Sequence, residues 1–309
     1  MTTSTRLQRL ARLADMLGTT WRHRNQYVVA QVDVYSGPAF LWAEAVCWML
    51  RRINKPYVLT LHGGQLPNFA RHWPKRVRHL LQSAAIVTTP SRYLAEQMQP
   101  YRSDLHLLPN PLDLSAYAHT VRTRPQPRLI WLRAFCEIYN PSLAPRVLAI
   151  LSQDFPDSSL IMIGPDKGDG SLQFTQQVAE ELGVTDRLEL PGGVPKAKVP
   201  LWLNKGDIFI NTTNIDNTPV SVLEAMACGL CVVSTDVGGL PYLLEQEQDT
   251  LLVPPDDPEA MAAAVRRLLT EQQLAERLSR QARQKTEQFD WSVLLSRWDT
   301  LLRAAAKNN

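Results

Sequence analysis

The chain contains few cysteines and lacks long apolar runs, and each of these absences excludes a class of protein. Four cysteines among 309 residues are too few for a disulfide scaffold, which fits a reducing compartment. The most apolar helix that we expect, over residues 39–50, is too short to span a bilayer and contains Glu44. No uninterrupted apolar segment follows the N-terminal arginines, so no secretory signal is predicted. We therefore expect a cytoplasmic protein, either free or attached peripherally to the inner membrane face.

The rest of the composition is that of ordinary globular material, with 45% hydrophobic and 20% charged residues. The length allows two domains with real cores. Cys228 and Cys231 form a C-x-x-C pattern, but they lie within an apolar run and no second cysteine pair accompanies them. Buried packing is therefore the default interpretation, in preference to a redox or zinc role.

The small net charge of +3 is unevenly distributed along the chain. Residues 1–115 contain 14 Lys and Arg against 6 Asp and Glu, a net charge of +8, whereas the remainder contains 19 against 24, a net charge of −5. The basic residues gather in two clusters, at 6–24 and 71–79. These clusters are either solvated helix faces or a surface that attracts anionic lipid or a lipid diphosphate. Nucleic acid is not an expected partner, because no recognised nucleic-acid motif accompanies the charge.

An amphipathic helix is predicted near the N-terminus. Apolar residues recur there at helical spacing beside the arginines, at Leu7, Leu10, Leu13, Ala14 and Leu17. This pattern fits a helix at a membrane interface, and equally a helix docked on its own domain.

Strand and helix patterns alternate along the whole chain, which is typical of α/β domains with parallel sheets. In the first part, strands are predicted at 27–32, 57–61, 85–88 and 105–108, and helices at about 38–54, 73–83 and 91–98. A polar, proline-containing segment at 122–128 is interpreted as an interdomain linker. Strands then follow at 129–132, 160–163, 207–211, 231–234 and 250–253, before a helical tail over about 259–306. We expect two doubly wound domains that bind ligand at the carboxyl ends of their strands.

The most informative stretch runs over residues 216–239. Thr218 is a predicted N-cap and Pro219 a predicted first helical residue. Gly229 is expected to end this helix, and the apolar run after it is predicted to be a buried strand. Glu224 lies on an otherwise apolar helix face. Because an unpaired carboxylate is seldom buried, a polar group should meet it.

This stretch resembles the donor-binding signature of glycosyltransferase family 4, whose members are retaining enzymes with the GT-B fold. Two Glu residues separated by seven others bracket the donor in that family; Glu224 matches the second, and Asp216 stands in place of the first. The resemblance implies an α/β chain with two facing Rossmann-like domains, the first of them reduced. It implies an acceptor-side domain at 1–121, a nucleotide-sugar-binding domain at 122–290, and a helix at 291–309 that crosses back to the first domain.

Arg133 follows directly after a predicted strand, where sheets of this kind bind ligands. The resemblance implies that it holds the leaving diphosphate, for which a guanidinium is suited. The family pairs this Arg with a Lys five residues later, but Ile138 occupies that position here. Lys167 and Lys205 are candidate substitutes, and nothing in the sequence places either of them.

Further donor contacts are expected within the signature stretch. The backbone N–H groups of Val220 and Ser221 lie at a predicted helix N-terminus, which favours a phosphate. By resemblance, Glu224 accepts hydrogen bonds from the ribose hydroxyls. Gly238 and Gly239 are expected to lie near the donor sugar.

The first domain contributes candidates of its own. His62 ends a predicted strand, and by resemblance it contacts the donor sugar and supports the charge that develops there. Together with Arg133 and Asp216 it forms the expected catalytic set. Gly63, Gly64 and Asn110 are expected to line the acceptor side or the cleft, and Asp113 is expected to brace a turn.

The resemblance implies a hexosyltransferase that moves a sugar from a nucleotide sugar to a saccharide or lipid-linked acceptor, in the synthesis of a surface polysaccharide or glycolipid. No D-x-D motif occurs, so we expect no metal, and no cofactor apart from the nucleotide-sugar substrate. One alternative is a degenerate member that binds a nucleotide sugar or a partner glycosyltransferase without turnover. Another is a different GT-B enzyme, such as a nucleotide-sugar epimerase.

The first domain departs from the family pattern. Family members open with a strand and a Gly-rich loop, whereas this chain opens with a basic helix and a strand that resembles a later one. About four strands are therefore expected in this domain. Three explanations stay open: a misplaced start of the recorded sequence, a partner chain that completes the sheet, or a naturally reduced form.

Overall fold

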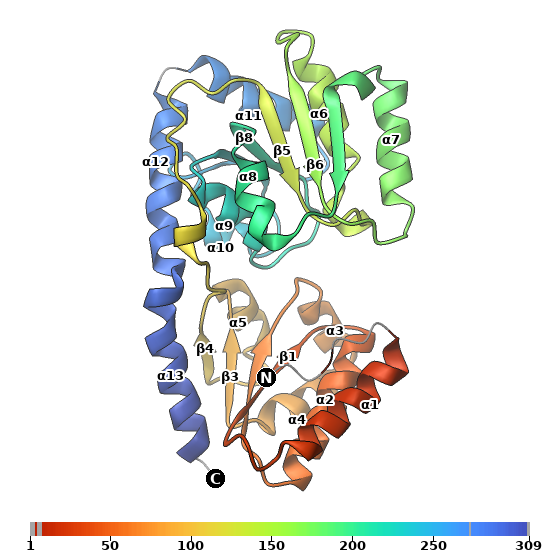
Figure 1. Cartoon of the computed structure of the whole chain (residues 1–309), viewed down its shortest axis with the longest axis vertical. Helices are drawn as coiled ribbons and strands as arrows, with labels where there is room; N and C mark the ends of the chain where they lie inside the picture. The colour runs from red at the N-terminus through yellow and green to blue at the C-terminus, as the bar shows by residue number, and fades with distance from the viewer. Residues whose placement is uncertain (1–3, 5–7, 272, 308–309) are drawn as a thin grey trace. The chain divides into compact units, whose positions relative to one another are not determined.

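The computed structural model describes Ser4 and residues 8–271 and 273–307. The chain divides into two compact units, one formed by residues 1–110 with 292–309 and the other by residues 111–291 (Figure 1). Each unit contains a parallel sheet covered by helices. Among the described residues, none of the helices combines the length and the apolarity that a bilayer crossing requires.

The first unit is built on a four-stranded sheet with the order β1-β2-β3-β4, in which all pairs are parallel. The strands are β1 (Ala30–Val34), β2 (Tyr57–Leu61), β3 (Ile86–Thr89) and β4 (Leu105–Leu107). The expected number of strands in this unit is thus confirmed. Its helices are α1 (Arg9–Arg22), α2 (Pro38–Arg52), α3 (Leu66–His72), α4 (Pro74–Gln82), α5 (Arg92–Met98) and most of α13 (Trp291–Lys307).

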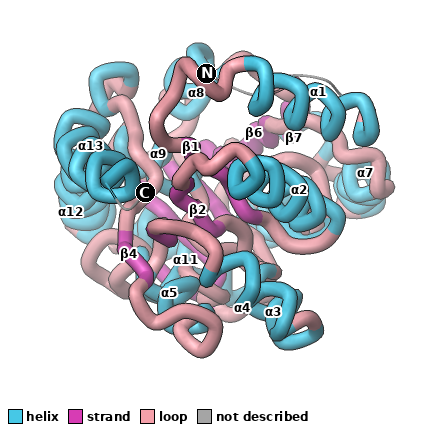
Figure 2. Tube along the Cα trace, turned by 90° about the horizontal axis from the view of Figure 1, so that it is seen from below, coloured by secondary structure: helices cyan, strands magenta, loops and turns pink. Residues whose placement is uncertain are grey.

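Helices cover both faces of the first sheet. Side chains of β1, β2 and β3, such as Leu59 and Val87, pack with Phe40 of α2 and Leu80 of α4. On the opposite face, Val58 and Ile86 pack with the C-terminal part of α13, where Ala305 is buried. Figure 2 shows α13 and α2 on opposite sides of β1 and β2. The alternation of these contacts along the strands follows from the two-residue period of a strand.

The second unit is built on a six-stranded parallel sheet with the order β7-β6-β5-β8-β9-β10. The strands are β5 (Arg128–Leu132), β6 (Ser159–Ile163), β7 (Leu188–Gly192), β8 (Ile208–Asn211), β9 (Cys231–Thr235) and β10 (Leu251–Val253). In sequence order this is 3-2-1-4-5-6, the arrangement of a dinucleotide-binding Rossmann sheet. The direction of winding reverses between β5 and β8, so the loops after these two strands flank the point where such sheets bind ligands.

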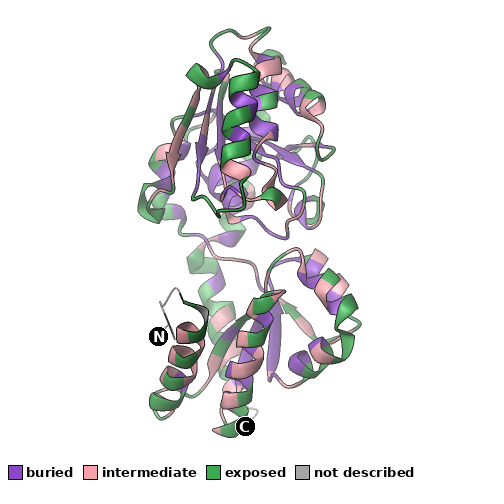
Figure 3. Ribbon diagram, turned by 90° about the vertical axis from the view of Figure 1, so that its right-hand side faces the viewer, coloured by how far each residue is buried: buried purple, intermediate pink, exposed green. Residues whose placement is uncertain are grey.

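Two helical layers bury the second sheet, whose strands are mostly inaccessible (Figure 3). One face packs on α6 (Leu143–Leu151) and α11 (Pro258–Thr270). The other packs on α8 (Val199–Leu203), α9 (Val220–Ala227) and α10 (Leu240–Leu243). The remaining helices of this unit are α7 (Ser171–Glu181) and α12 (Leu274–Thr286).

The parallel α/β fold expected from the sequence is confirmed, and nine of the ten strands in the described part of the chain lie within three residues of their predicted positions. The sequence did not predict β7, in which Pro191 and Gly192 obscure a half-buried edge strand. Residues 111–121, which we assigned to the first domain, pack with the second unit. Leu112, Leu114 and Tyr117 share a core with Phe209 of β8 and Met226 of α9.

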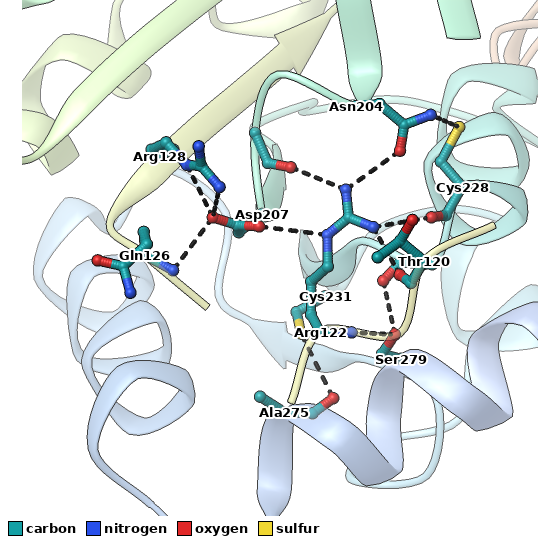
Figure 4. Close-up of polar contacts among 12 residues, drawn as sticks. Thr120, Arg122, Gln126, Arg128, Asn204, Asp207, Cys228, Cys231, Ala275 and Ser279 are labelled. Atoms are coloured by element: carbon teal, nitrogen blue, oxygen red, sulfur yellow. Dashed lines mark hydrogen bonds and ion pairs between the residues drawn. The ribbon is translucent and has the colours of Figure 1, made fainter. Parts of the chain in front are cut away.

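A buried arginine fixes the linker to the second unit (Figure 4). The Arg122 guanidinium donates to the carbonyl oxygens of Cys228 at 3.1 Å and Gly206 at 3.0 Å, and to Asn204 Oδ1 at 3.2 Å. Its Nε lies 3.2 Å from Asp207 Oδ1. This arginine thereby joins the linker to the end of α9 and to the segment that enters β8.

The C-x-x-C cysteines lie beside this arginine (Figure 4). Cys228 and Cys231 are both buried and neither forms a disulfide, which confirms that they pack in the interior. Burial raises the pKa of each thiol to about 12. Both are therefore protonated at neutral pH, and a reactive thiolate is absent from either position.

Candidate functional site

The two loops at the reversal point of the second sheet present an ion pair. Arg133 directly follows β5 and Asp216 lies in the loop after β8; Arg133 Nη2 contacts Asp216 Oδ2. The two side chains are only 16% and 12% exposed. The ring of Tyr139 lies under the guanidinium, 4.1 Å from its Cζ. The structure thus joins two residues of the expected catalytic set, which are 83 positions apart in the sequence.

The Arg133 guanidinium is not fully satisfied by this pair. Its Nε is buried and has no hydrogen-bond partner in the described part of the chain. Burial also lowers the pKa of the guanidinium, which reflects the cost of holding a charge away from water. A buried cation with a spare donor is a suitable site for an anionic ligand.

The N-terminus of α9 lies in the same loop region. The prediction that Thr218 caps this helix is wrong: the helix begins at Val220, and Pro219 occupies the cap position with an extended backbone. Instead, Thr218 Oγ1 and Ser221 Oγ are buried and have no hydrogen-bond partner among the described residues. The first N–H groups of a helix, here those of Val220 and Ser221, also have no acceptor within the helix. This cluster of unsatisfied donors at a positive helix end can bind an anion.

Gly229 ends α9 as predicted. Its backbone is left-handed, with φ of +78°. The N–H of Gly229 donates to Met226 O and that of Leu230 to Ala225 O, which satisfies the last carbonyls of the helix.

Gly238 and Gly239 are required by the packing of two loops. A Cβ atom on Gly238 would lie 2.2 Å from Asp216 O, and one on Gly239 would lie 2.0 Å from Asn217 O. The N–H of Gly239 also donates to Asp216 O at 3.1 Å. The glycines therefore hold the Asp216 loop in place, and their contact with a donor sugar stays a prediction.

Glu224 lies one turn into α9 and its side chain is only 5% exposed. The Tyr117 hydroxyl donates to Glu224 Oε1 at 2.5 Å, and Lys196 Nζ donates to the same oxygen at 2.7 Å. The expectation that a polar group meets this buried acid is thus confirmed. Burial, and next the hydrogen bond to Glu224, raises the pKa of Tyr117, so this phenol remains a donor at neutral pH.

Sequence reasoning missed both partners of Glu224. Lys196 lies 28 positions before it, in the loop after the unpredicted strand β7, and Tyr117 lies in the segment before the linker. Lys205 and Lys167 were the candidate substitutes for the missing lysine. Lys205 comes just before β8 and so lies at the amino edge of the sheet. Its Nζ is 3.4 Å from the centre of the Trp202 ring. Lys167 lies in an exposed loop after β6.

His62 follows β2 in the first unit, as predicted. Its Nε2 lies 3.1 Å from Asp33 Oδ1, and its ring stacks on Tyr35 with the centroids 5.0 Å apart. Gly63 adopts a left-handed backbone, and Gly64 lies in the turn that follows. Asp33 was not predicted, because it comes from a neighbouring strand.

The other predicted residues of this region lie where the two units divide. Asn110 is half-buried at the end of the first unit. Asp113 accepts a hydrogen bond from the N–H of Ser115 at 3.1 Å, so its expected role in bracing a turn is confirmed.

Comparison with known proteins identifies the class of protein that this fold and site define. The family model "Glycosyl transferases group 1" matches residues 124–285, and the model "Glycosyltransferase Family 4" matches residues 4–116. The chain belongs to the group 1 glycosyltransferases, of the family 4 type, with the GT-B fold. The expected family and fold are thus confirmed.

Individual relatives share the family at low identity. A D-inositol 3-phosphate glycosyltransferase of Paenarthrobacter aurescens is 24% identical over 81% of this chain. A D-inositol 3-phosphate glycosyltransferase of Jonesia denitrificans is 25% identical over 68% of this chain. The matched parts cover only 65% and 54% of these two relatives, so the chain spans less than two thirds of their length.

Solved structures share the fold over nearly the whole chain. Sucrose-phosphate synthase from Thermosynechococcus elongatus has a TM-score of 0.82 at 19% identity, and the match covers all of this chain and 82% of that one. Anabaena Alr3699/HepE in complex with UDP and glucose has a TM-score of 0.78 at 17% identity, covering 97% of this chain and 84% of that one.

Proposed function

We propose that this protein transfers a sugar from a nucleotide-sugar donor to a saccharide or lipid-linked acceptor, with retention at the anomeric carbon and without a metal. The observation that carries the proposal is the unsatisfied Arg133 guanidinium beside the N-terminus of α9, at the reversal point of a Rossmann sheet. Structural neighbours that were solved with UDP and with UDP-glucose support a nucleotide sugar as the ligand. Relatives named for teichuronic acid and colanic acid biosynthesis support a saccharide acceptor.

In the proposed reaction, the anomeric carbon loses its bond to the donor diphosphate and gains one to the acceptor oxygen on the same face. The acceptor proton passes to the departing diphosphate. Arg133 and the N–H groups of Val220 and Ser221 stabilise the negative charge that develops on the diphosphate. Glu224 accepts hydrogen bonds from the ribose hydroxyls, and Asp216 orients the sugar and Arg133. The contact expected between His62 and the donor sugar stays a prediction.

The proposal is tested by nucleotide binding followed by turnover. The purified protein is titrated calorimetrically with uridine, guanosine and adenosine diphosphates, and the nucleotide that binds defines the sugar nucleotides for assay against an acceptor panel. We expect binding and transfer. Binding without transfer across the panel would favour the degenerate alternative, epimerised donor would favour the epimerase, and no binding of any nucleotide would refute the proposal.

Glu224→Ala is expected to abolish recognition of the ribose. The parent should prefer the ribonucleoside diphosphate over its 2′-deoxy analogue by about tenfold or more, since a hydrogen bond to a charged group is lost. In the Glu224→Ala variant, the ratio of the affinities for the two nucleotides should fall close to one. The ratio is measured by calorimetry, and Glu276→Ala on the exposed face of α12 serves as the control. An unchanged ratio in Glu224→Ala would contradict the assignment.

We also propose that the first unit attaches to an anionic membrane surface. Large apolar side chains are exposed on α1 and α2, at Leu10, Trp21, Leu41 and Trp48. Arginines accompany both tryptophans: Arg24 lies 4.4 Å from the Trp21 ring centre and Arg52 lies 5.3 Å from that of Trp48. Exposed aromatic rings beside cations fit an interface of lipid headgroups, and the charge of +8 over residues 1–115 complements anionic lipid.

Vesicle sedimentation tests this attachment. The protein should bind phosphatidylglycerol vesicles and not phosphatidylcholine vesicles, and added salt should weaken binding. The double variant Trp21→Ser/Trp48→Ser should bind about tenfold more weakly, because two interfacial anchors are lost. Phe174→Ser, which removes an exposed aromatic ring from α7 in the second unit, should bind as the parent does. Equal sedimentation with both lipids would refute the proposal.

A further inference from the structure

The ion pair of Lys196 with Glu224 joins an exposed side chain to a buried one. The Lys196 side chain is 66% exposed, whereas that of Glu224 is 5% exposed, and their charged atoms are 2.7 Å apart. The Tyr117 hydroxyl donates to the same carboxylate oxygen, so Glu224 keeps a partner if the lysine leaves. The Lys196 side chain is mostly exposed, so water can solvate its ammonium when it leaves the carboxylate.

The strand end that precedes Lys196 is bonded to a glycine that packs on the Arg133 backbone. The N–H of Gly164, after β6, donates to the carbonyl of Gly192 at the end of β7, four residues before the lysine. A Cβ atom on Gly164 would lie 1.6 Å from Arg133 O, so only glycine permits this approach. The ends of β5, β6 and β7 are thereby packed together, and Lys196 is on the same edge of the sheet as Arg133.

The N-terminus of α9 is within reach of the lysine. Val220 precedes Glu224 by one turn, which is about 6 Å along the helix axis. Rotation of a long, flexible lysine side chain can move its ammonium over that distance. The ammonium can therefore contact either the Glu224 carboxylate or an anion held by the N–H groups of Val220 and Ser221.

We propose that Lys196 is the second cation of the donor site, an inference that rests on the proposed function. In the free protein it neutralises the buried Glu224 carboxylate. When a nucleotide binds, the ribose hydroxyls replace the ammonium on Glu224, and Lys196 moves to the diphosphate. It thus supplies a charge that Ile138 cannot. Ile138 uses its backbone carbonyl to accept hydrogen bonds from Asn214 N and Thr213 Oγ1.

This exchange predicts that Lys196 affects the binding of nucleosides and of nucleoside diphosphates differently. A nucleoside that lacks phosphates must displace Lys196 from Glu224, and it has no anionic group for the ammonium to contact. A nucleoside diphosphate offers it two phosphates. Lys196 therefore strengthens binding of the diphosphate and opposes binding of the bare nucleoside, and these opposite effects distinguish it from a residue that only orients Glu224.

The test compares Lys196→Met with Lys198→Met, which removes the other exposed lysine of the same 3₁₀ turn. Affinities are measured calorimetrically for the nucleoside diphosphate that the parent binds, and by displacement for the matching nucleoside. In Lys196→Met, binding of the diphosphate should weaken about tenfold, as expected for one charged contact, and binding of the nucleoside should become stronger. Lys196→Arg should restore most of the diphosphate affinity, and Lys198→Met should bind both ligands as the parent does.

Two outcomes would overturn the inference while the proposed function stands. Lys196→Met could bind the diphosphate as tightly as Lys198→Met does, in which case the lysine never reaches the phosphates. Alternatively, the affinities for nucleoside and diphosphate could fall by the same factor, in which case Lys196 acts only through Glu224. A parent protein that binds no nucleotide would instead remove the proposed function itself.

Discussion

Arg133→Ala is expected to lower kcat for sugar transfer by about three orders of magnitude, equivalent to about 4 kcal/mol of transition-state stabilisation. The guanidinium is buried at the reversal point of the second sheet, with an unsatisfied Nε available to the donor diphosphate. A charge held away from water acts strongly on a leaving group and needs no reorganisation during the reaction. The effect is measured as transfer from the donor identified by nucleotide titration.

Loss of activity must be separated from loss of folding. Arg133→Ala leaves Asp216 buried without its partner, which typically destabilises a protein by about 3–5 kcal/mol. The double variant Arg133→Ala/Asp216→Ala removes both charges, so its thermal unfolding should lie closer to that of the parent. We expect the double variant to remain inactive. Recovery of transfer together with stability would show that Arg133 serves the fold and not the reaction.

Arg122→Met is expected to lower the free energy of unfolding of the second unit by about 3–5 kcal/mol. The variant leaves Asp207 with less compensation and removes the donors to the Cys228 and Gly206 carbonyls. In a unit of this size, such a loss lowers Tm by roughly 6–20 °C. Thermal unfolding followed by circular dichroism measures it.

Arg128→Ala is the matched control for this variant. Arg128 donates to the other oxygen of the same Asp207, at 2.7 Å, but its own side chain is half exposed. Its removal should cost less than about 1 kcal/mol. We attribute the effect of Arg122 to its buried position and not to the ion pair as such. Equal losses of unfolding free energy in the two variants would contradict this.

The parallel sheets could be predicted because buried parallel strands are short apolar runs bounded by turns. β2 shows this: Tyr57–Leu61 is wholly buried and its predicted bounds are those observed. β7 was not predicted because it is a half-buried edge strand with a proline and a glycine at its end. The position of Arg133 after β5 was also predictable, since it needs only the end of an apolar run.

Partners within the candidate site were harder to predict. The pairs Arg133 with Asp216, Glu224 with Lys196 and His62 with Asp33 each join different strands or loops. Their formation depends on strand order and loop path, which local patterns do not contain. The prediction that Thr218 caps α9 was wrong for a local reason. Pro219 adopts an extended backbone, so the helix begins one residue later than predicted and the threonine hydroxyl has no hydrogen-bond partner among the described residues.

The division of the chain has an evolutionary consequence. Arg133, Lys196, Asp216 and Glu224 all belong to the unit formed by residues 111–291, and so does Tyr117, although it precedes the linker. The groups proposed to bind the nucleotide part of the donor are therefore inherited as one module. Substitutions in the first unit that spare His62 should therefore leave the nucleotide preference unchanged. Recombination within such genes should preserve the nucleotide preference when the crossover falls before residue 111, and should disrupt the Tyr117 contact when it falls in the linker.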